Sequence, residues 1–299
     1  MNKGLRHYIQ EAGLTHLADK LETLVMPAIR IDIHSLDEGE ILPLGVSRFG
    51  GLPDLPPAIE WPICGDVPLT FLAQFNMVDL REYDVEGVLP ATGLLSIFYE
   101  ADEQPSGYFP WERGNWRVIY YEGDLAHIHQ TSPPSELKIT FPIVKHSFSL
   151  EDTLPSNEGR HVGEIELNDE EWDAYIELKG SMRGGNHLTP IHQFLGHPEG
   201  PETDMPLLCQ LASNGVWPYN GDPREAELRD GANDWRLLLQ IDTDIKIALP
   251  KVWREDNYIN LDTRGSWVWH DAGMLYFWIQ KDALQQKNFD NVWMQLVGG

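Results

Sequence analysis

Apolar positions follow two spacings along this chain, and each spacing predicts one kind of element. Over residues 5–24 they recur every three or four positions, broken at Gly13, which predicts one kinked helix or two short ones. Over residues 29–33 they alternate with polar residues, which is typical of a half-buried strand. Residues 47–68 are rich in proline and glycine and therefore predict a long loop.

One apolar pattern occurs twice. Residues 69–76 form an apolar run with a single glutamine, Gln74, and a glycine-led apolar run follows at 93–99. Residues 236–242 repeat the first run around Gln240, and residues 273–279 repeat the second. Two similar blocks in one chain indicate a duplicated architecture. We therefore predict an α+β fold of mostly antiparallel sheet, with two similar halves from internal duplication sharing one core.

The other segments supply further strands and helices. Asn168 is the expected N-cap of a helix with three carboxylates in its first turn. Residues 180–206 are rich in Gly, His and Pro and predict a loop with one short helical turn. Strands are predicted at 116–121, 125–129, 137–150 and 292–297, and helices at 168–178, 222–229 and 281–287.

The polar, broken stretch at 151–163 is the expected boundary between the halves. It divides one globular domain into an N-terminal helical segment with the first strand (1–44), a first half (45–160) and a second half (161–299).

The charge of the chain narrows the range of partners. The formal net charge is −25, and acidic residues outnumber basic ones in both halves. Such a surface repels phosphate backbones, which argues against nucleic acid, whereas a basic protein would be attracted. Solubility alone is the simpler explanation of this charge. Two isolated cysteines and the lack of a long apolar stretch predict a cytoplasmic protein with no disulfides and no membrane span.

Short motifs along the chain resemble one known family. In order, they are GGLP at 50–53, WP at 61–62, PL at 68–69, FLAQ at 71–74, LP at 89–90, GLL at 93–95, HQFLG at 192–196, LLQID at 238–242 and DAG at 271–273. Their order is similar to that of the YwqG-like family, a bacterial domain of unknown function. The resemblance implies an α+β fold with internal duplication. It implies no activity and supplies no catalytic residues.

Two kinds of polar residue invite a binding role. Gln74 and Gln240 lie in apolar strands, where a buried amide needs partners; pairing with loop backbone is the expected role, and ligand binding is the alternative. Arg48 precedes the adjacent Gly50 and Gly51. That loop predicts either a tight turn or an anion cradle with Arg48 as its clamp.

Metal and catalytic signatures are missing from the sequence. There is no HExxH and no GxSxG, and neither cysteine stands in a catalytic pattern. Asp242, Asp244 and Asp271 are expected to be solvated carboxylates, with a Mg²⁺ or Ca²⁺ site as the alternative. His270 and Asp271 are expected to hold a turn. We therefore predict no metal, no cofactor and no catalytic residue.

Eleven tryptophans remain, and core packing is expected to use most of them. Trp111 and Trp116 flank one aromatic loop; exposed and coplanar, they would form a carbohydrate platform. The leading hypothesis is a non-catalytic interaction protein and, more sharply, an immunity-type inhibitor of a basic partner. The alternative is a small-ligand binder or enzyme that uses a cleft between the halves, with Arg48 and Asp271 as polar anchors.

Overall fold

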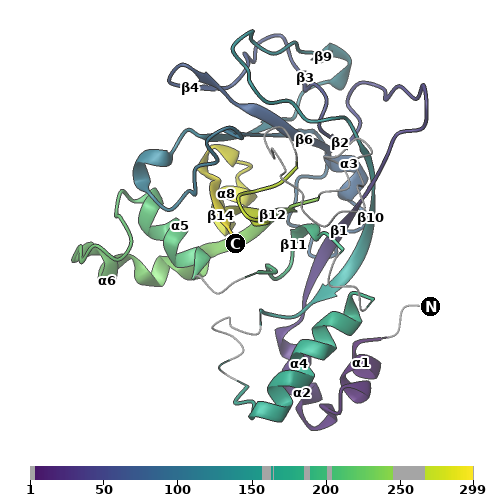
Figure 1. The fold of residues 1–299 in the computed structure, drawn as a ribbon, viewed down its shortest axis with the longest axis vertical. Helices are drawn as coiled ribbons and strands as arrows, with labels where there is room; N and C mark the ends of the chain where they lie inside the picture. The colour runs from purple at the N-terminus through teal and green to yellow at the C-terminus, as the bar shows by residue number, and fades with distance from the viewer. Residues whose placement is uncertain are drawn as a thin grey trace, which may run out of the picture.

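Two antiparallel sheets form the centre of the structure, a computed structural model that describes residues 4–156, 163, 165–184, 189–200, 204–244 and 267–298. The larger sheet has the strand order β10-β1-β11-β12-β13-β14, and the four-stranded sheet has the order β2-β6-β7-β8. Two-stranded ribbons β3-β9 and β4-β5 lie at one end of the molecule (Figure 1). The predicted α+β class with mostly antiparallel sheet is confirmed.

The strands are mostly short. The six-stranded sheet contains β1 (Met26–His34), β10 (Lys145–Thr153), β11 (His192–Leu195), β12 (Trp235–Asp242), β13 (Met274–Gln280) and β14 (Trp293–Val297). The four-stranded sheet contains β2 (Arg48–Phe49), β6 (Thr70–Asn76), β7 (Leu94–Tyr99) and β8 (Trp116–Tyr121). The ribbons contain β3 (Asp54–Leu55), β4 (Ile63–Cys64), β5 (Val67–Pro68) and β9 (His129–Gln130).

The helices lie around the sheets. The α-helices are α1 (Leu5–Glu11), α2 (Ala18–Leu24), α3 (Met77–Leu80), α4 (Asp169–Met182), α5 (Met205–Ser213), α6 (Arg224–Leu228) and α8 (Lys281–Gln285). Short 3₁₀ helices occur at η1 (Thr15–Leu17), η2 (Pro110–Glu112), η3 (Leu125–His127), η5 (Arg229–Asp234) and η6 (Phe289–Asn291).

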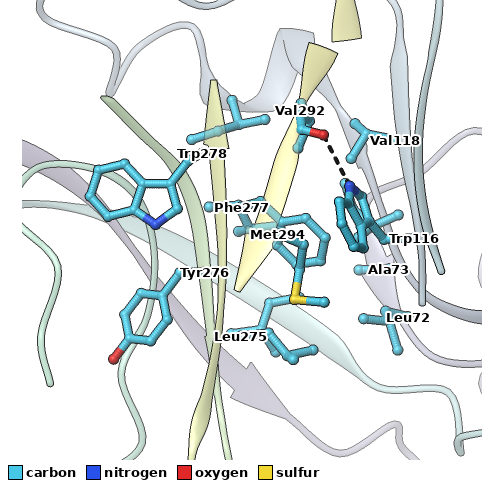
Figure 2. Close-up of a cluster of buried hydrophobic side chains, with 14 of the residues drawn as sticks. Leu72, Ala73, Trp116, Val118, Leu275, Tyr276, Phe277, Trp278, Val292 and Met294 are labelled. Carbon is cyan, nitrogen blue, oxygen red and sulfur yellow. Dashed lines mark hydrogen bonds between the residues drawn. The ribbon is translucent and has the colours of Figure 1, made fainter. Parts of the chain in front are cut away.

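The main core lies between the two sheets (Figure 2). Trp116 and Val118 of β8 face Phe277 of β13 and Met294 of β14. The indole N–H of Trp116 donates to the carbonyl of Val292 at 3.0 Å, so its polar atom is satisfied inside the core. Because both sheets bury their apolar faces against each other, the two predicted halves share one core.

A second, smaller core joins the N-terminal helices to α4, in the lower part of Figure 1. Ile9 and Leu21 of the first two helices pack with Tyr175 and Leu178 of α4. The predicted cap is confirmed: Asn168 accepts from the backbone N–H of Glu171, whose carboxylate accepts from the N–H of Asn168. This reciprocal pair fixes where α4 begins and therefore which of its side chains face the sheet.

Several sequence interpretations are wrong in detail. Residues 192–195 were expected in a loop, but they form β11 in the middle of the six-stranded sheet, because β1 and β12 flank them and satisfy their backbone. Residues 125–127 form a 3₁₀ helix rather than a strand. The loop at 47–68 contains four two-residue strands, and 137–144 lies outside named strands, with one isolated bridge at Val144. The expected boundary residues 151–153 complete β10.

The two predicted halves repeat one strand arrangement. Strands β2-β6-β7-β8 and β11-β12-β13-β14 are both four-stranded antiparallel ladders; the second uses consecutive strands, whereas β3, β4 and β5 lie between β2 and β6 in the chain. Arg48 faces Gln74 in the first ladder, and Gln193 faces Gln240 in the second. The register shifts two residues before each glutamine, between 71 and 73 and between 237 and 239. Duplication as the origin of the halves stays a prediction, which these repeated features favour.

Each buried glutamine fastens a loop to its sheet, as predicted. Gln74 accepts from the N–H of Asp54 at 2.9 Å and donates to the carbonyl of Val46 at 2.8 Å. Gln240 accepts from the N–H of Glu199 at 2.9 Å and donates to the carbonyl of Ile191 at 3.1 Å. We call these two arrangements the glutamine clamps.

The two clamped loops also share a backbone path. The first reads FGGLPD at 49–54 and the second FLGHPE at 194–199. Gly50 and Gly51 have φ values of 62° and 72°, and Leu195 and Gly196 have 60° and 70°. The tight turn predicted at the adjacent glycines is confirmed, with both residues in the left-handed region, and the same path recurs in the second loop. Only Leu195 lacks the freedom of glycine, and it is buried.

Replacing either clamp glutamine with methionine should lower the free energy of unfolding by about 2 kcal/mol, because two buried or partly buried backbone groups lose their partner. Urea unfolding of Gln74→Met and Gln240→Met would measure this. The exposed Gln285→Met is the matched control, expected within about 0.5 kcal/mol of the parent. Clamp variants that unfold at the same urea concentration as the control would contradict the structural role.

His146 of β10 lies among phenylalanine rings near the core. Its ring centroid is 4.5 Å from that of Phe148, 6.0 Å from Phe75 and 6.1 Å from Phe49. Burial, with a smaller contribution from His34, lowers the pKa of His146 from 6.5 to about 4. The folded protein therefore keeps this imidazole neutral at mildly acidic pH, whereas the unfolded chain protonates it.

Since the unfolded state binds this proton first, the free energy of unfolding should fall as the pH drops from about 6.5 to about 4, by up to about 3 kcal/mol from His146. Unfolding measured at about pH 7 and about pH 4.5 should show a smaller loss for His146→Phe than for the parent. The exposed His127→Phe controls for removal of a histidine. The same loss in all three proteins would contradict the assignment.

Candidate functional site

Arg48 forms an ion pair inside the protein. Its side chain is buried; Nη1 donates to Asp54 Oδ2 at 2.8 Å, and Nη2 donates to the carbonyl of Leu52. Asp54 Oδ2 also accepts from the backbone of Gly45 and the amide of Gln74. Burial alone would raise the pKa of Asp54, but Arg48 and these donors hold it below its ordinary value. Arg48 therefore stabilises the clamped loop as an ion pair inside the protein.

Asp271 lies in a different environment. It occupies an exposed turn between Trp269 and Gly273, which are joined by a backbone bridge. The neighbouring His270 donates its backbone N–H to the side chain of Gln104 at 2.7 Å, so the predicted turn is confirmed. Arg48 is thus buried in an ion pair, whereas Asp271 faces solvent. This difference counts against a ligand-binding cleft that uses both residues as polar anchors.

Trp111 and Trp116 differ in how far their side chains are exposed to solvent. Trp111 is 66% exposed, whereas Trp116 is 5% exposed and packs at 5.0 Å between ring centroids against Trp293. The two indoles therefore cannot form the exposed, coplanar platform on which the carbohydrate hypothesis depends, and that hypothesis is wrong for this pair. Trp116 belongs to the core because its strand, β8, covers β14 (Figure 2).

Trp111 instead belongs to a cluster that the sequence did not reveal. Its ring stacks on Phe109, with centroids 4.7 Å apart and planes at 10°. Trp217, from the loop after α5, meets both rings nearly edge-on, at 5.7 Å from Phe109 and 5.8 Å from Trp111. Trp217 is itself 47% exposed. We call Phe109, Trp111 and Trp217 the aromatic surface.

Acidic segments carry the aromatic surface. Residues 100–113 contain four acidic side chains and one basic, and residues 217–234 contain five acidic and two basic. The second segment includes α6 and η5, which pack on α5 beside the aromatic loop. The aromatic surface therefore combines exposed apolar area with nearby negative charge. Both properties favour the binding of a partner.

A second feature is a charged cavity of about 220 Å³ between α4 and the six-stranded sheet. Lys179 and Arg183 enter it from one face of α4, and Arg30 enters it from β1. Glu199, from the second clamped loop, and Asp242, at the end of β12, supply negative charge. Ile176, Ile191 and Met274 add apolar wall.

Ion pairs link most of these charges. Glu199 Oε2 lies 2.8 Å from Arg183 Nη1 and 3.2 Å from Lys179 Nζ. Arg183 also lies 3.5 Å from Glu151 of β10, and Arg30 lies 3.9 Å from the same carboxylate. Burial lowers the pKa of Lys179, which Glu199 partly offsets, and burial raises the pKa of Asp242.

Comparison with known proteins places the chain in a family. A family model described as a domain of unknown function, DUF1963, matches residues 47–297, which spans the two clamped loops and both ladders. The chain belongs to the DUF1963 family. No curated protein matches it.

For this DUF1963 protein, the described residues hold no group of three or more His, Cys, Asp or Glu side chains placed to bind a metal ion. Asp242 and Asp244 are buried, so the expectation that they are solvated is wrong. Asp242 instead accepts from the N–H of Ile191 at 2.8 Å. Both cysteines are free thiols. Within the part of the chain that the structure describes, no helix has the length and apolarity to cross a bilayer.

Sequence reasoning missed both features of this DUF1963 protein. Trp217 lies 106 positions after Trp111, and no local pattern joins two such distant loops. The cavity had one weak signal: Lys179, in the last turn of α4, stands four positions before Arg183, the C-cap residue of that helix, whose first turn is strongly acidic. Cations at that spacing share a helix face, but a basic C-terminal turn is equally expected from the helix dipole.

Proposed function

We propose that this DUF1963 protein is a non-catalytic interaction protein whose aromatic surface docks a basic partner protein. The observation that carries the proposal is the packing of Phe109, Trp111 and Trp217 into one exposed cluster. Burying these three large rings in the core would stabilise the folded protein more than leaving them at the surface does. Their joint position at the surface therefore favours a docking role.

The surroundings of the rings favour a cationic partner. The two acidic segments attract a basic protein over long range and raise its rate of association. At contact, the exposed indole faces of Trp111 and Trp217 suit the guanidinium and ammonium groups of arginine and lysine, through cation–π interaction. Tryptophan is also frequent among the residues that contribute most binding energy at protein interfaces.

An immunity-type inhibitor of a basic protein is the sharper form of this proposal, since acidic inhibitors gain both rate and selectivity from complementary charge. The proposal extends to a YwqG-like protein within the DUF1963 family, on the motif order in the sequence, and to a cytoplasmic location, on the two free thiols. Duplication of one ladder and its clamped loop accounts for the shared geometry of the halves.

Full-length tagged protein captured from its own host at low salt should retain a basic protein in stoichiometric amount, measured by native mass spectrometry. Replacing both exposed indoles, in Trp111→Ser with Trp217→Ser, should remove that protein, because the docking contacts are lost. Higher salt should weaken the complex as it screens the acidic segments.

Ile41→Ser is the matched control, since Ile41 is 89% exposed and lies outside the aromatic surface. It should retain the partner, and both variants should keep the unfolding midpoint of the parent. Retention of the same partner by the double tryptophan variant, or capture of no basic protein at low salt, would refute the proposed function.

A further inference from the structure

Equivalent positions in the two clamped loops differ in charge. In the first loop, Arg48 neutralises the acidic residue that closes the turn, Asp54. In the second, the position of Arg48 is taken by Gln193, and Glu199 takes that of Asp54. Gln193 keeps one function of Arg48, because it donates to the carbonyl of His197 as Arg48 donates to the carbonyl of Leu52.

The exchange of arginine for glutamine leaves Glu199 without a cation in its own loop. Its backbone is still held by Gln240, and its carbonyl accepts from the hydroxyl of Tyr276. The carboxylate is therefore presented at a fixed place and pairs with α4 instead, through Lys179 and Arg183. The first loop is closed by its own ion pair, whereas the second contributes one wall of the charged cavity.

Lys179 is a buried cation of this cavity that pairs with Glu199. The residue is 8% exposed, and its Nζ lies 3.2 Å from Glu199 Oε2. An ammonium group has three hydrogens to donate, so one carboxylate oxygen leaves donor capacity for a further acceptor. A buried lysine with such capacity at the wall of a cavity is suited to bind an anionic group.

We propose that the cavity binds a small molecule through an oxyanion group, a carboxylate or a phosphate, which accepts hydrogen bonds from Lys179 Nζ beside Arg183. The cavity lining carries three cations and two carboxylates, and Glu151 also pairs with two of the cations, Arg183 and Arg30. Arginine and lysine are the side chains that bind such anions most strongly, and a partly buried site increases the attraction.

A neutral or donor group of the same ligand would suit Asp242, which also lines the cavity. Asp242 is buried, and the raised pKa of its carboxyl reflects the cost of holding its charge away from water. A hydroxyl or amino group would compensate it by donating a hydrogen bond. About 220 Å³ lies below the range usual for drug-sized ligands, so the ligand is a small metabolite rather than a nucleotide cofactor.

Two probes test the site in the full-length protein: inorganic phosphate and succinate, each compared with chloride at matched ionic strength. At least one should raise the unfolding midpoint of the parent above the chloride value, by mass action on the folded state. An effect of phosphate alone assigns the phosphate class, and an effect of succinate alone assigns the carboxylate class. If neither exceeds chloride, the proposal is overturned.

Lys179→Met should weaken binding of the active probe by about tenfold or more, because a charge-assisted hydrogen bond is lost. The unfolding midpoint of each variant without probe serves as its own reference, since Lys179→Met also removes an ion pair with Glu199. The control is Lys145→Met, which removes a paired, partly exposed lysine outside the cavity and should leave probe binding unchanged. Unchanged binding by Lys179→Met would overturn the proposal.

A measurement on the parent protein keeps the test independent of any variant. Titration of the active probe, followed by amide NMR, should shift the signal of Gly180, which lines the cavity, and leave that of Gly65, in the β4-β5 ribbon, in place. Shifts at Gly65 without shifts at Gly180 would contradict the assigned site. None of these readouts depends on a basic partner protein, so this inference and the proposed function fail separately.

Discussion

Each ladder of this protein depends on one buried glutamine. A loop that passes over the end of a sheet leaves backbone donors and acceptors that must be satisfied away from water. Gln74 and Gln240 each satisfy one donor and one acceptor of such a loop, from a strand in which both sequence neighbours of the glutamine are apolar. The clamps thereby fix where Asp54 and Glu199 stand, and the ion pairs of both loops follow from those positions.

The two clamped loops share one backbone path but have different roles. With arginine before the turn, the loop closes on its own carboxylate and becomes a stable part of the core. With glutamine there, the turn keeps its path, because Gln193 still bonds to the loop carbonyl, but the carboxylate turns to α4. The exchange of Arg48 for Gln193, together with Glu199 in place of Asp54, thus separates a structural ion pair from a charged cavity. The aromatic surface, on other loops, is independent of both.

Much of the fold could be predicted where the signal is local. The Asn168 cap depends on residues three apart, and the twin glutamines stand out against apolar neighbours, so both were visible in the sequence. Strand β11 was not, because four residues among Gly, His and Pro become a strand only through pairing with β1 and β12. Neither site could be predicted as a whole, because each is formed by segments distant in the sequence. The cavity needs α4, β1 and β12 to come together, and the aromatic surface needs Phe109 to meet Trp217.

Coupling free energies within each loop would show whether its carboxylate depends on the residue before the turn. Double-mutant cycles in urea unfolding would use Arg48→Gln with Asp54→Asn in the first loop, and Gln193→Ala with Glu199→Gln in the second. The coupling free energy should exceed about 2 kcal/mol in the first loop, where a buried ion pair is broken, and stay below about 0.5 kcal/mol in the second. Equal couplings would show that the two carboxylates are held in the same way.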